Sequence, residues 1–245
     1  MLRSVNEILG YSIKAKDEEV GKVSNFYFDD ERWTIRYLIA DTGSWLLGKQ
    51  ILISPAGFYG KPDWKNKIFS VVFRDKEQVK ECPDIYTNKP VSRQKELEYI
   101  NYFGWPAYWD LEAQQRVAPM MVPPKAAGQD SEEKNTHLRS VKEVKGYHIH
   151  AKDGEIGHVE DFIIDDEKWD IRFIVVAIRN ILPGKKVLIP TMWIQKVSWK
   201  DSEVYVGLIK ENVEKSLTYD PSTPVNSESE GKLYDYYGRP NKQNN

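Results

Sequence analysis

The sequence predicts a mainly β protein built as two tandem small β-barrels, each with short helices and a helical aromatic tail. Two observations support this prediction. Residues 2–53 align with residues 138–189 without a gap, and 26 of these 52 positions are identical, so the chain contains an internal duplication. Within each copy, short β-rich stretches are separated by tight-turn signals and followed by two stretches with helix-capping residues.

The β-rich stretches of the second copy are the clearest. YHIHA, from Tyr147, and EIGHVEDFII, from Glu155, flank Asp153-Gly154, which is a strong hairpin signal. The next run, WDIRFIVVAI from Trp169, alternates as a half-buried strand does. Two further strands are expected in KVLIP and EVYVGLI, with QILIS and KIFSVVF as the equivalents in the first copy. About six short strands in so small a unit are typical of a small barrel.

Each copy should also contain two helices. In the first copy, Asp75 with Gln78 three residues later forms a capping box, and Pro83 ends that helix. A second helix should begin after Ser92 and end at Gly104. The equivalents in the second copy are a helix around Val213 and a helix between Asn226 and Gly238.

The domain boundaries follow from the repeat. We expect one barrel with its tail at residues 1–112 and a second at residues 137–240. Residues 113–136 are rich in Pro, Ala and charged residues without a hydrophobic period, which predicts a flexible linker. Residues 241–245 should be disordered.

The composition excludes several classes of protein. Lys plus Arg (35) nearly balance Asp plus Glu (37), so we expect no DNA partner. The single cysteine, Cys82, excludes an internal disulfide and fits a reducing compartment. The N-terminus lacks a signal-peptide pattern, and the longest wholly apolar run, FIVVAI, is far below the ~20 residues that a membrane-spanning helix needs. The sequence therefore predicts a soluble, cytoplasmic protein.

Four motifs occur in the same order in both copies: GYxIxAKDxExGxV, FxxDDExWxIR, LxGKxxLI and a closing tail like YxxYYGRP. With these motifs in this combination, the chain resembles the PRC-barrel family. The family pattern occurs twice, and the two copies together cover nearly the whole chain. Members include the cytoplasmic domain of the photosynthetic reaction-centre H subunit, the C-terminal domain of a bacterial ribosome-maturation factor and many stand-alone bacterial proteins. The resemblance implies a small, strongly bent barrel that serves as a docking or adaptor module without a shared catalytic centre.

Three groups of residues are candidate sites. The first is the duplicated acid cluster, Asp29-Asp30-Glu31 and Asp165-Asp166-Glu167, which lies between two expected strands. Asp favours turn starts, and one short turn presents too few oxygen ligands for a cation, so we interpret the cluster as a hairpin corner instead of a metal or catalytic site.

The second candidate is a zinc-type metal site formed by His148, His150 and His158. An HxH pair on a strand places two imidazoles on one face, and a bulge at Gly157 would bring His158 to the same side. The first copy has Ser12, Lys14 and Lys22 at these three positions, so the fold does not need the histidines. A polar outer face of the barrel explains the same pattern without a metal.

The third candidate is a set of aromatic residues in the two tails. Its members are Tyr99, Tyr102, Phe103, Trp105, Tyr108, Trp109, Tyr234, Tyr236 and Tyr237. Because such a tail is too apolar to remain in water, it should either fold back over its own or the sister barrel, or bind a partner protein or a second copy of the chain. The expected strand around Ile174 and Val176 is also apolar on both faces, which requires cover on both.

No enzyme signature is present: the sequence has no P-loop, GxSxG, HExxH or dinucleotide-type GxGxxG motif. We therefore predict a non-enzymatic protein-interaction module without a cofactor. Self-association, either as a homodimer or by packing of the repeats, is compatible with the duplication. Two alternatives stay open: a peripheral, H-subunit-like modulator of a photosynthetic or electron-transfer membrane complex, and an assembly factor that binds RNA or the ribosome.

Overall fold

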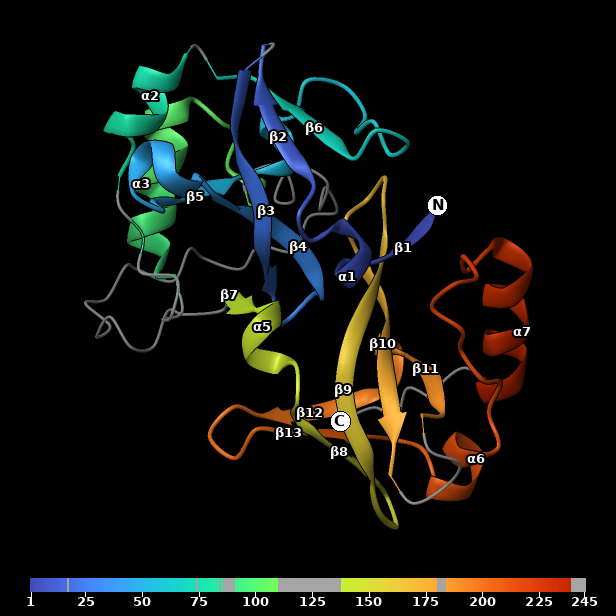
Figure 1. Cartoon of the computed structure of the whole chain (residues 1–245). Coiled ribbons are helices and arrows are strands. Elements are labelled where there is room, and N and C mark those ends of the chain that lie inside the picture. The colour runs from blue at the N-terminus through green and yellow to red at the C-terminus, as the bar shows by residue number, and fades with distance from the viewer. Residues whose placement is uncertain are drawn as a thin grey trace, which may run out of the picture. The chain divides into compact units, whose positions relative to one another are not determined.

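The structure, a computed structural model, describes residues 1–16, 18–73, 75–83, 85, 91–109, 138–179 and 184–238. These residues are mainly β, with two sheets and short helices (Figure 1). The chain divides into two compact units. The N-terminal unit consists of Gly10–Glu31 and Arg36–Arg139, and the C-terminal unit consists of Met1–Leu9, Arg32–Ile35 and Ser140–Asn245. The linker predicted at residues 113–136 and the tail at residues 241–245 lie outside the described residues.

The N-terminal unit is built on a sheet with the strand order β5-β4-β3-β2-β6, and β7 pairs with β3 outside this path. Its strands are β2 (Ser12–Ala15), β3 (Glu18–Asp29), β4 (Thr34–Asp41), β5 (Gln50–Ile53), β6 (Ile68–Val71) and β7 (Leu138–Ser140). Its helices are α2 (Lys76–Glu81) and α3 (Arg93–Phe103), with 3-10 turns at Gly43–Leu46 and Pro55–Gly57.

The C-terminal unit repeats this plan with the order β11-β10-β9-β8-β13-β12, and β1 pairs with β9. Its strands are β1 (Leu2–Ser4), β8 (His148–Ala151), β9 (Gly154–Asp165), β10 (Ile171–Ile178), β11 (Lys186–Pro190), β12 (Ile194–Ser198) and β13 (Glu203–Val206). Its helices are α1 (Val5–Ile8), α5 (Val141–Val144), α6 (Lys210–Glu214) and α7 (Ser227–Tyr237), with a 3-10 turn at Thr191–Trp193.

The prediction of a mainly β fold is confirmed, but the sheets are not closed into barrels. Among the described residues each sheet has two end strands that do not pair with each other: β5 and β6 in one, β11 and β12 in the other. The long central strands β3 and β9 bend at a bulge. In β9, Ile149 faces Gly157 and His150 faces Glu155, which leaves Ile156 as the extra residue of the bulge predicted there.

A glycine is needed at this bulge in both copies because the neighbouring strand lies close. A Cβ atom on Gly157 would lie 1.9 Å from the carbonyl oxygen of Ala177, and one on Gly21, the equivalent residue, would lie 2.6 Å from that of Asp41. The backbones of the two strands can approach so closely only without a side chain at this position. The glycine therefore occurs in both copies because the close packing of the two strands requires it.

The helix signals in the sequence correspond to real helix ends. Asp75 caps α2 by accepting a hydrogen bond from the Gln78 amide, and Ser92 and Asn226 cap α3 and α7 in the same way. Gly104, with φ at 69°, ends α3 in the left-handed conformation. Because α3 and α7 have the same length, each begins after a capping side chain and each ends at a glycine, each residue of α3 has an equivalent in α7, 134 positions later.

The compact units do not coincide with the two copies predicted at residues 1–112 and 137–240. β1 comes from the first copy and pairs antiparallel with β9 of the second, with Leu2 opposite Asp165 and Ser4 opposite Ile163. β7 comes from the start of the second copy and pairs with β3 of the first. Each unit is therefore completed by the LRS strand of the other copy.

Candidate functional site

The duplicated acid cluster forms the corner between two strands, as predicted, and each of its first two acids has a separate structural role. The side chains of Asp29 and Asp165 accept hydrogen bonds from backbone amides two residues later, which starts the turn. Trp33 and Trp169 close it with φ angles of 56° and 63°. These bonds explain why the same residues occur at both corners.

The second acid of each cluster binds the exchanged strand. Asp166 accepts a hydrogen bond from Arg3 of β1 at 2.8 Å and also pairs with the N-terminal ammonium group. Asp30 pairs with Arg139 of β7 at 3.2 Å. LRS is identical in β1 and β7, so in both units the second acid of the cluster binds the arginine of this strand. The sequence did not reveal that role.

The buried Asp161 on β9 adds a further contact to the first nine residues. Its carboxylate, 4% exposed, accepts hydrogen bonds from the Ser4 hydroxyl and from the Asn6 amide, the latter at 3.1 Å. Burial raises the pKa of Asp161, and the hydrogen bond from Ser4 opposes that rise. The equivalent residue in the first copy is the buried Asn25.

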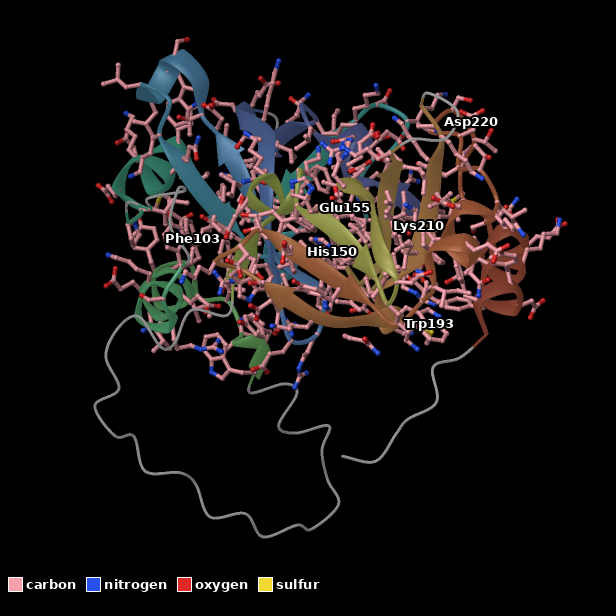
Figure 2. All side chains as sticks on the ribbon, turned by 90° about the horizontal axis from the view of Figure 1, so that it is seen from below. Phe103, His150, Glu155, Trp193, Lys210 and Asp220 are labelled. Atoms are coloured by element: carbon pink, nitrogen blue, oxygen red, sulfur yellow. The ribbon has the colours of Figure 1, made fainter. Side chains whose placement is uncertain are left out.

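The three histidines lie on one face of β8 and β9, and two of them, His148 and His150, pair with carboxylates. His148 faces His158 across the strand pair. The Nδ1 atom of His148 lies 3.0 Å from Glu155 Oε1, and the Nε2 atom of His150 lies 3.3 Å from Glu203 Oε1. Figure 2 labels His150 and Glu155 on neighbouring strands.

The structure does not assemble these histidines into the predicted metal site. Within the described part of the chain, no three His, Cys, Asp or Glu residues are grouped so that they could hold a metal ion. In the first copy Ser12, at the position of His148, bonds to Glu19, at the position of Glu155. Both copies thus have a glutamate partner at this position, but the first copy has a serine in place of the histidine. A polar outer face of the sheet accounts for this pattern without a metal.

The aromatic tail of the first copy packs against its own unit. Phe103 stacks against both Phe73 and Trp105, with ring centroids 5.0 and 4.5 Å away. The Trp105 indole lies so close to Gly57 that a Cβ atom there would be 2.7 Å from its nitrogen. The Tyr102 hydroxyl donates to the Gln78 carbonyl at 2.9 Å.

The second tail packs in the same manner. The Tyr236 hydroxyl donates to the Asn212 carbonyl at 2.8 Å, Tyr237 is buried, and the Tyr234 ring lies against Phe173. Of the nine aromatic residues proposed for partner binding, Tyr236 is the most exposed, at 44%. The structure thus corresponds to the alternative in which each tail folds back on its own unit.

A buried polar cluster lies beneath the first tail, and sequence reasoning missed it. Glu96 on α3 is fully buried, and its carboxylate accepts hydrogen bonds from the hydroxyls of Tyr37 and Tyr108 at 3.2 and 3.0 Å. Arg93 lies 3.5 Å from Glu96, and its guanidinium covers the Trp109 ring at 3.8 Å. The cluster therefore links α3, β4 and the tail.

Burial raises the pKa of Glu96 to about 7, although Arg93 and the two tyrosine hydroxyls oppose the rise. A signal in the sequence could have indicated this residue. Glu96 occupies the same helix stripe as Tyr99 and Phe103, where the spacing of three to four residues predicts burial. An acid on a buried stripe requires partners, and one of those partners, Tyr37, is 59 positions away in the sequence.

The second copy contains a simpler version of this cluster. Glu230, at the position of Glu96, pairs with Arg172 at 2.7 Å, and its side chain is 22% exposed. Arg172 also donates to the Tyr234 hydroxyl at 3.2 Å. Phe173 stands at the position of Tyr37, so one of the hydroxyl donors is missing. The two units therefore hold their last helix by related but different polar contacts.

An exposed apolar pair distinguishes the N-terminal unit. Tyr59 and Val72 are 76% and 60% exposed. Phe58 and Val71 face each other in an antiparallel bridge, with backbone bonds from Tyr59 to Ser70 and from Val72 to Gly57. Tyr59 and Val72 therefore share the face of this ribbon that points away from Phe58 and Val71.

Comparison with known proteins agrees with part of the resemblance seen in the sequence. Residues 2–75 match the PRC-barrel domain family. This range covers the first copy from β1 to β6, and the second copy lies outside it. No curated protein matches the chain. None of the helices in the described ranges is both long enough and apolar enough to span a membrane.

Proposed function

We propose that this chain is a tandem PRC-barrel-type protein that acts as a non-enzymatic protein-interaction module, and that the face of Tyr59 and Val72 binds the partner protein. The family match over residues 2–75 supports the domain type for the first copy. The 26 identities between residues 2–53 and 138–189 support the same type for the second. The family resemblance implies docking in place of catalysis.

The observation that carries the choice of surface is the exposure of this apolar pair. A large aromatic and a branched aliphatic side chain lie on the same face in water, where each loses the free energy that burial would provide. The fold does not require them, because Gln195 and Gly207 occupy their positions in the C-terminal unit. The equivalence of Val72 and Gly207 follows from their backbone bonds: the Val72 amide donates to the Gly57 carbonyl, and the Gly207 amide donates to the Trp193 carbonyl. Aromatic residues at such positions commonly anchor protein interfaces.

A photo-crosslinking amino acid placed at Tyr59 of the full chain tests this proposal in cells. We expect one reproducible crosslinked partner from position 59 and none from Gln195, the matched control position in the other unit. The purified partner should then bind the double variant Tyr59→Ser, Val72→Ser at least tenfold more weakly than the unmodified chain. Since both side chains are exposed, the variant should unfold at an unchanged temperature. Equal crosslinking from both positions, or an unchanged affinity, would refute the proposed surface.

A further inference from the structure

The face of Tyr59 and Val72 continues from β6 onto β2, which lies between β6 and β3 in the sheet (Figure 1). The Ser70 carbonyl of β6 accepts a hydrogen bond from the Tyr59 amide, and on its other side Ser70 is the partner of Lys14 on β2. Residues opposite each other on neighbouring strands share a face of the sheet. Lys14 therefore lies on the face of Tyr59, two inter-strand spacings or about 10 Å away.

A second lysine lies in the adjoining row of the same face. Ser12 of β2 is the partner of Ile68 on β6 and of Lys22 on β3. Ser12 and Lys14 are two residues apart, so their side chains point to one face, whereas Ile13 between them is fully buried on the other. We call this surface the β2–β6 face, and its large side chains are Lys14, Lys22, Tyr59, Ile68 and Val72.

The two lysines of the β2–β6 face have no acidic partner in the chain. Neither Lys14 nor Lys22 forms an ion pair or a side-chain hydrogen bond with the residues that the structure describes. Glu19 lies opposite Lys14 on β3, but its carboxylate accepts a hydrogen bond from the Ser12 hydroxyl. A carboxylate of a bound molecule can therefore pair with either lysine without displacing an acid of the chain.

The equivalent face of the C-terminal unit supplies its own acid. His150 stands at the position of Lys14, and its Nε2 atom lies 3.3 Å from Oε1 of Glu203, the equivalent of Ile68. The ring of Tyr205 stacks on that of His150, with centroids 5.2 Å apart. The N-terminal unit has an isoleucine in place of this glutamate, so a carboxylate for Lys14 has to come from another molecule.

We infer that the partner protein binds the β2–β6 face through a short segment in which Asp or Glu residues flank an apolar side chain. The apolar side chain covers Tyr59 and Val72, and the carboxylates pair with Lys14 and Lys22. An extended segment advances about 3.3 Å per residue, so about four residues span this face. The inference rests on the proposed function and adds to it the chemistry of the partner.

A nucleic acid fits this face less well than an acidic protein segment does, although phosphate groups also pair with lysine. Glu19 lies opposite Lys14, and Asp63 lies opposite Ile68, so two acids of the chain share the face with the lysines. A continuous row of phosphates would meet these acids, and the whole chain has a net charge of -2. A protein segment can instead place single carboxylates at the lysines and an apolar side chain at Tyr59.

Selection from a displayed library of random peptides, with the full chain as bait, tests the inference. We expect the selected peptides to share an aromatic or aliphatic residue flanked by Asp or Glu. A synthetic peptide of this consensus should bind at least tenfold more tightly than its copy with Asn and Gln in place of the acids, because the copy forms no ion pairs. The affinity of the acidic peptide should also fall as salt is raised.

Two double variants of the full chain assign the contacts. Lys14→Gln with Lys22→Gln should remove the difference in affinity between the two peptides, as expected for residues that interact directly. His148→Gln with His150→Gln makes the matched change in the C-terminal unit and should leave that difference unchanged. An unchanged unfolding temperature shows that each variant is folded.

The experiment separates failure of this inference from failure of the proposed function. If the selected peptides require Tyr59 and Val72 but bind equally well without their acids, the face binds protein and the inferred acidic partner is wrong. If no peptide is selected, or if binding survives Tyr59→Ser with Val72→Ser, both the inference and the proposed surface are wrong. If instead a uridine-rich single-stranded RNA binds through Lys14 and Lys22, while no acidic peptide does, the partner is a nucleic acid and the inference is overturned.

Discussion

At the scale of single residues, Glu96 is the most unusual group in the N-terminal unit. A fully buried carboxyl group is held by two tyrosine hydroxyls and an arginine, and its pKa of about 7 lies within the physiological range. The protonated acid can still donate and accept hydrogen bonds in this cluster. Ionisation instead places a charge in surroundings that disfavour it, so the tail contact depends on pH.

Glu96→Gln should therefore remove part of the pH dependence of stability. The folded chain binds the Glu96 proton more tightly than the unfolded chain, because the pKa rises from 4.5 to about 7 on folding. The stabilisation is fully present below pH 4.5 and is lost as the pH rises through 7. We expect urea unfolding of the unmodified chain to lose about 3 kcal/mol from this residue between pH 4.5 and 8, and the variant to lack that loss.

Glu230→Gln is the matched control for this measurement, because it changes the equivalent residue of α7. The Glu230 carboxylate is partly exposed and paired with Arg172. Its replacement should remove one ion pair without removing the loss of stability between pH 4.5 and 8. If Glu96→Gln retains the full pH dependence of the unmodified chain, the Glu96 cluster is not the source.

At the scale of elements, the sequence predicted helix ends and turns better than strand pairing. Ser92, Asn226, Asp75 and the two acid corners act through neighbours within four residues, so their local pattern determines the result. The exchange of β1 and β7 has no such local signal. Because LRSV occurs unchanged in both copies, the strand pattern alone cannot show which long strand each LRS segment pairs with.

Asp161 is expected to determine how firmly β1 and α1 are held. Asp161→Ala removes the acceptor of the Ser4 hydroxyl and the Asn6 amide, and hydrogen bonds to a carboxylate contribute about 1.5–3 kcal/mol each. Hydrogen exchange of residues 2–8 should become about 100-fold faster, while α7 remains protected. Asn25→Ala, at the equivalent position of the first copy, is the control and should leave residues 2–8 unchanged. Equal exchange rates in the two variants would contradict this role.

The sequence predicted the acid corners correctly but not the surroundings of the histidines or the Glu96 cluster, and the difference has a physical reason. The acid corners were interpreted correctly as turns because each Asp bonds to its own turn. The carboxylates of Glu155 and Glu203, which come from β9 and β13 and pair with His148 and His150, were not visible as neighbours of these histidines in the sequence. The Glu96 cluster was missed for the same reason, since Tyr37 is 59 positions away.

At the scale of the whole molecule, the division into units implies that residues 1–9 act as a ligand of the second copy. Val5 and Ile8 are fully buried, Asp161 and Asp166 bind the polar groups of the segment, and β1 adds a strand to β9. Burial of two aliphatic side chains contributes about 3–6 kcal/mol before the cost of ordering the segment. This contribution is a substantial fraction of the free energy of unfolding of an ordinary domain, which is about 5–15 kcal/mol.

A chain that begins at Gly10 should therefore unfold more readily, and a synthetic peptide of Met1–Leu9 added in trans should restore its stability. The peptide retains the ammonium group and Arg3, both of which pair with Asp166, so its binding should weaken as salt is raised. A control peptide with Val5 and Ile8 replaced by Ser keeps these charges but should not restore stability, because it cannot fill the apolar contacts. The measurement is the unfolding temperature at increasing peptide concentration. This temperature should rise as the peptide saturates its site, because the peptide binds only the folded chain. If the shortened chain is as stable as the full chain, or if both peptides act alike, then β1 only covers the edge of β9 and does not complete the C-terminal unit.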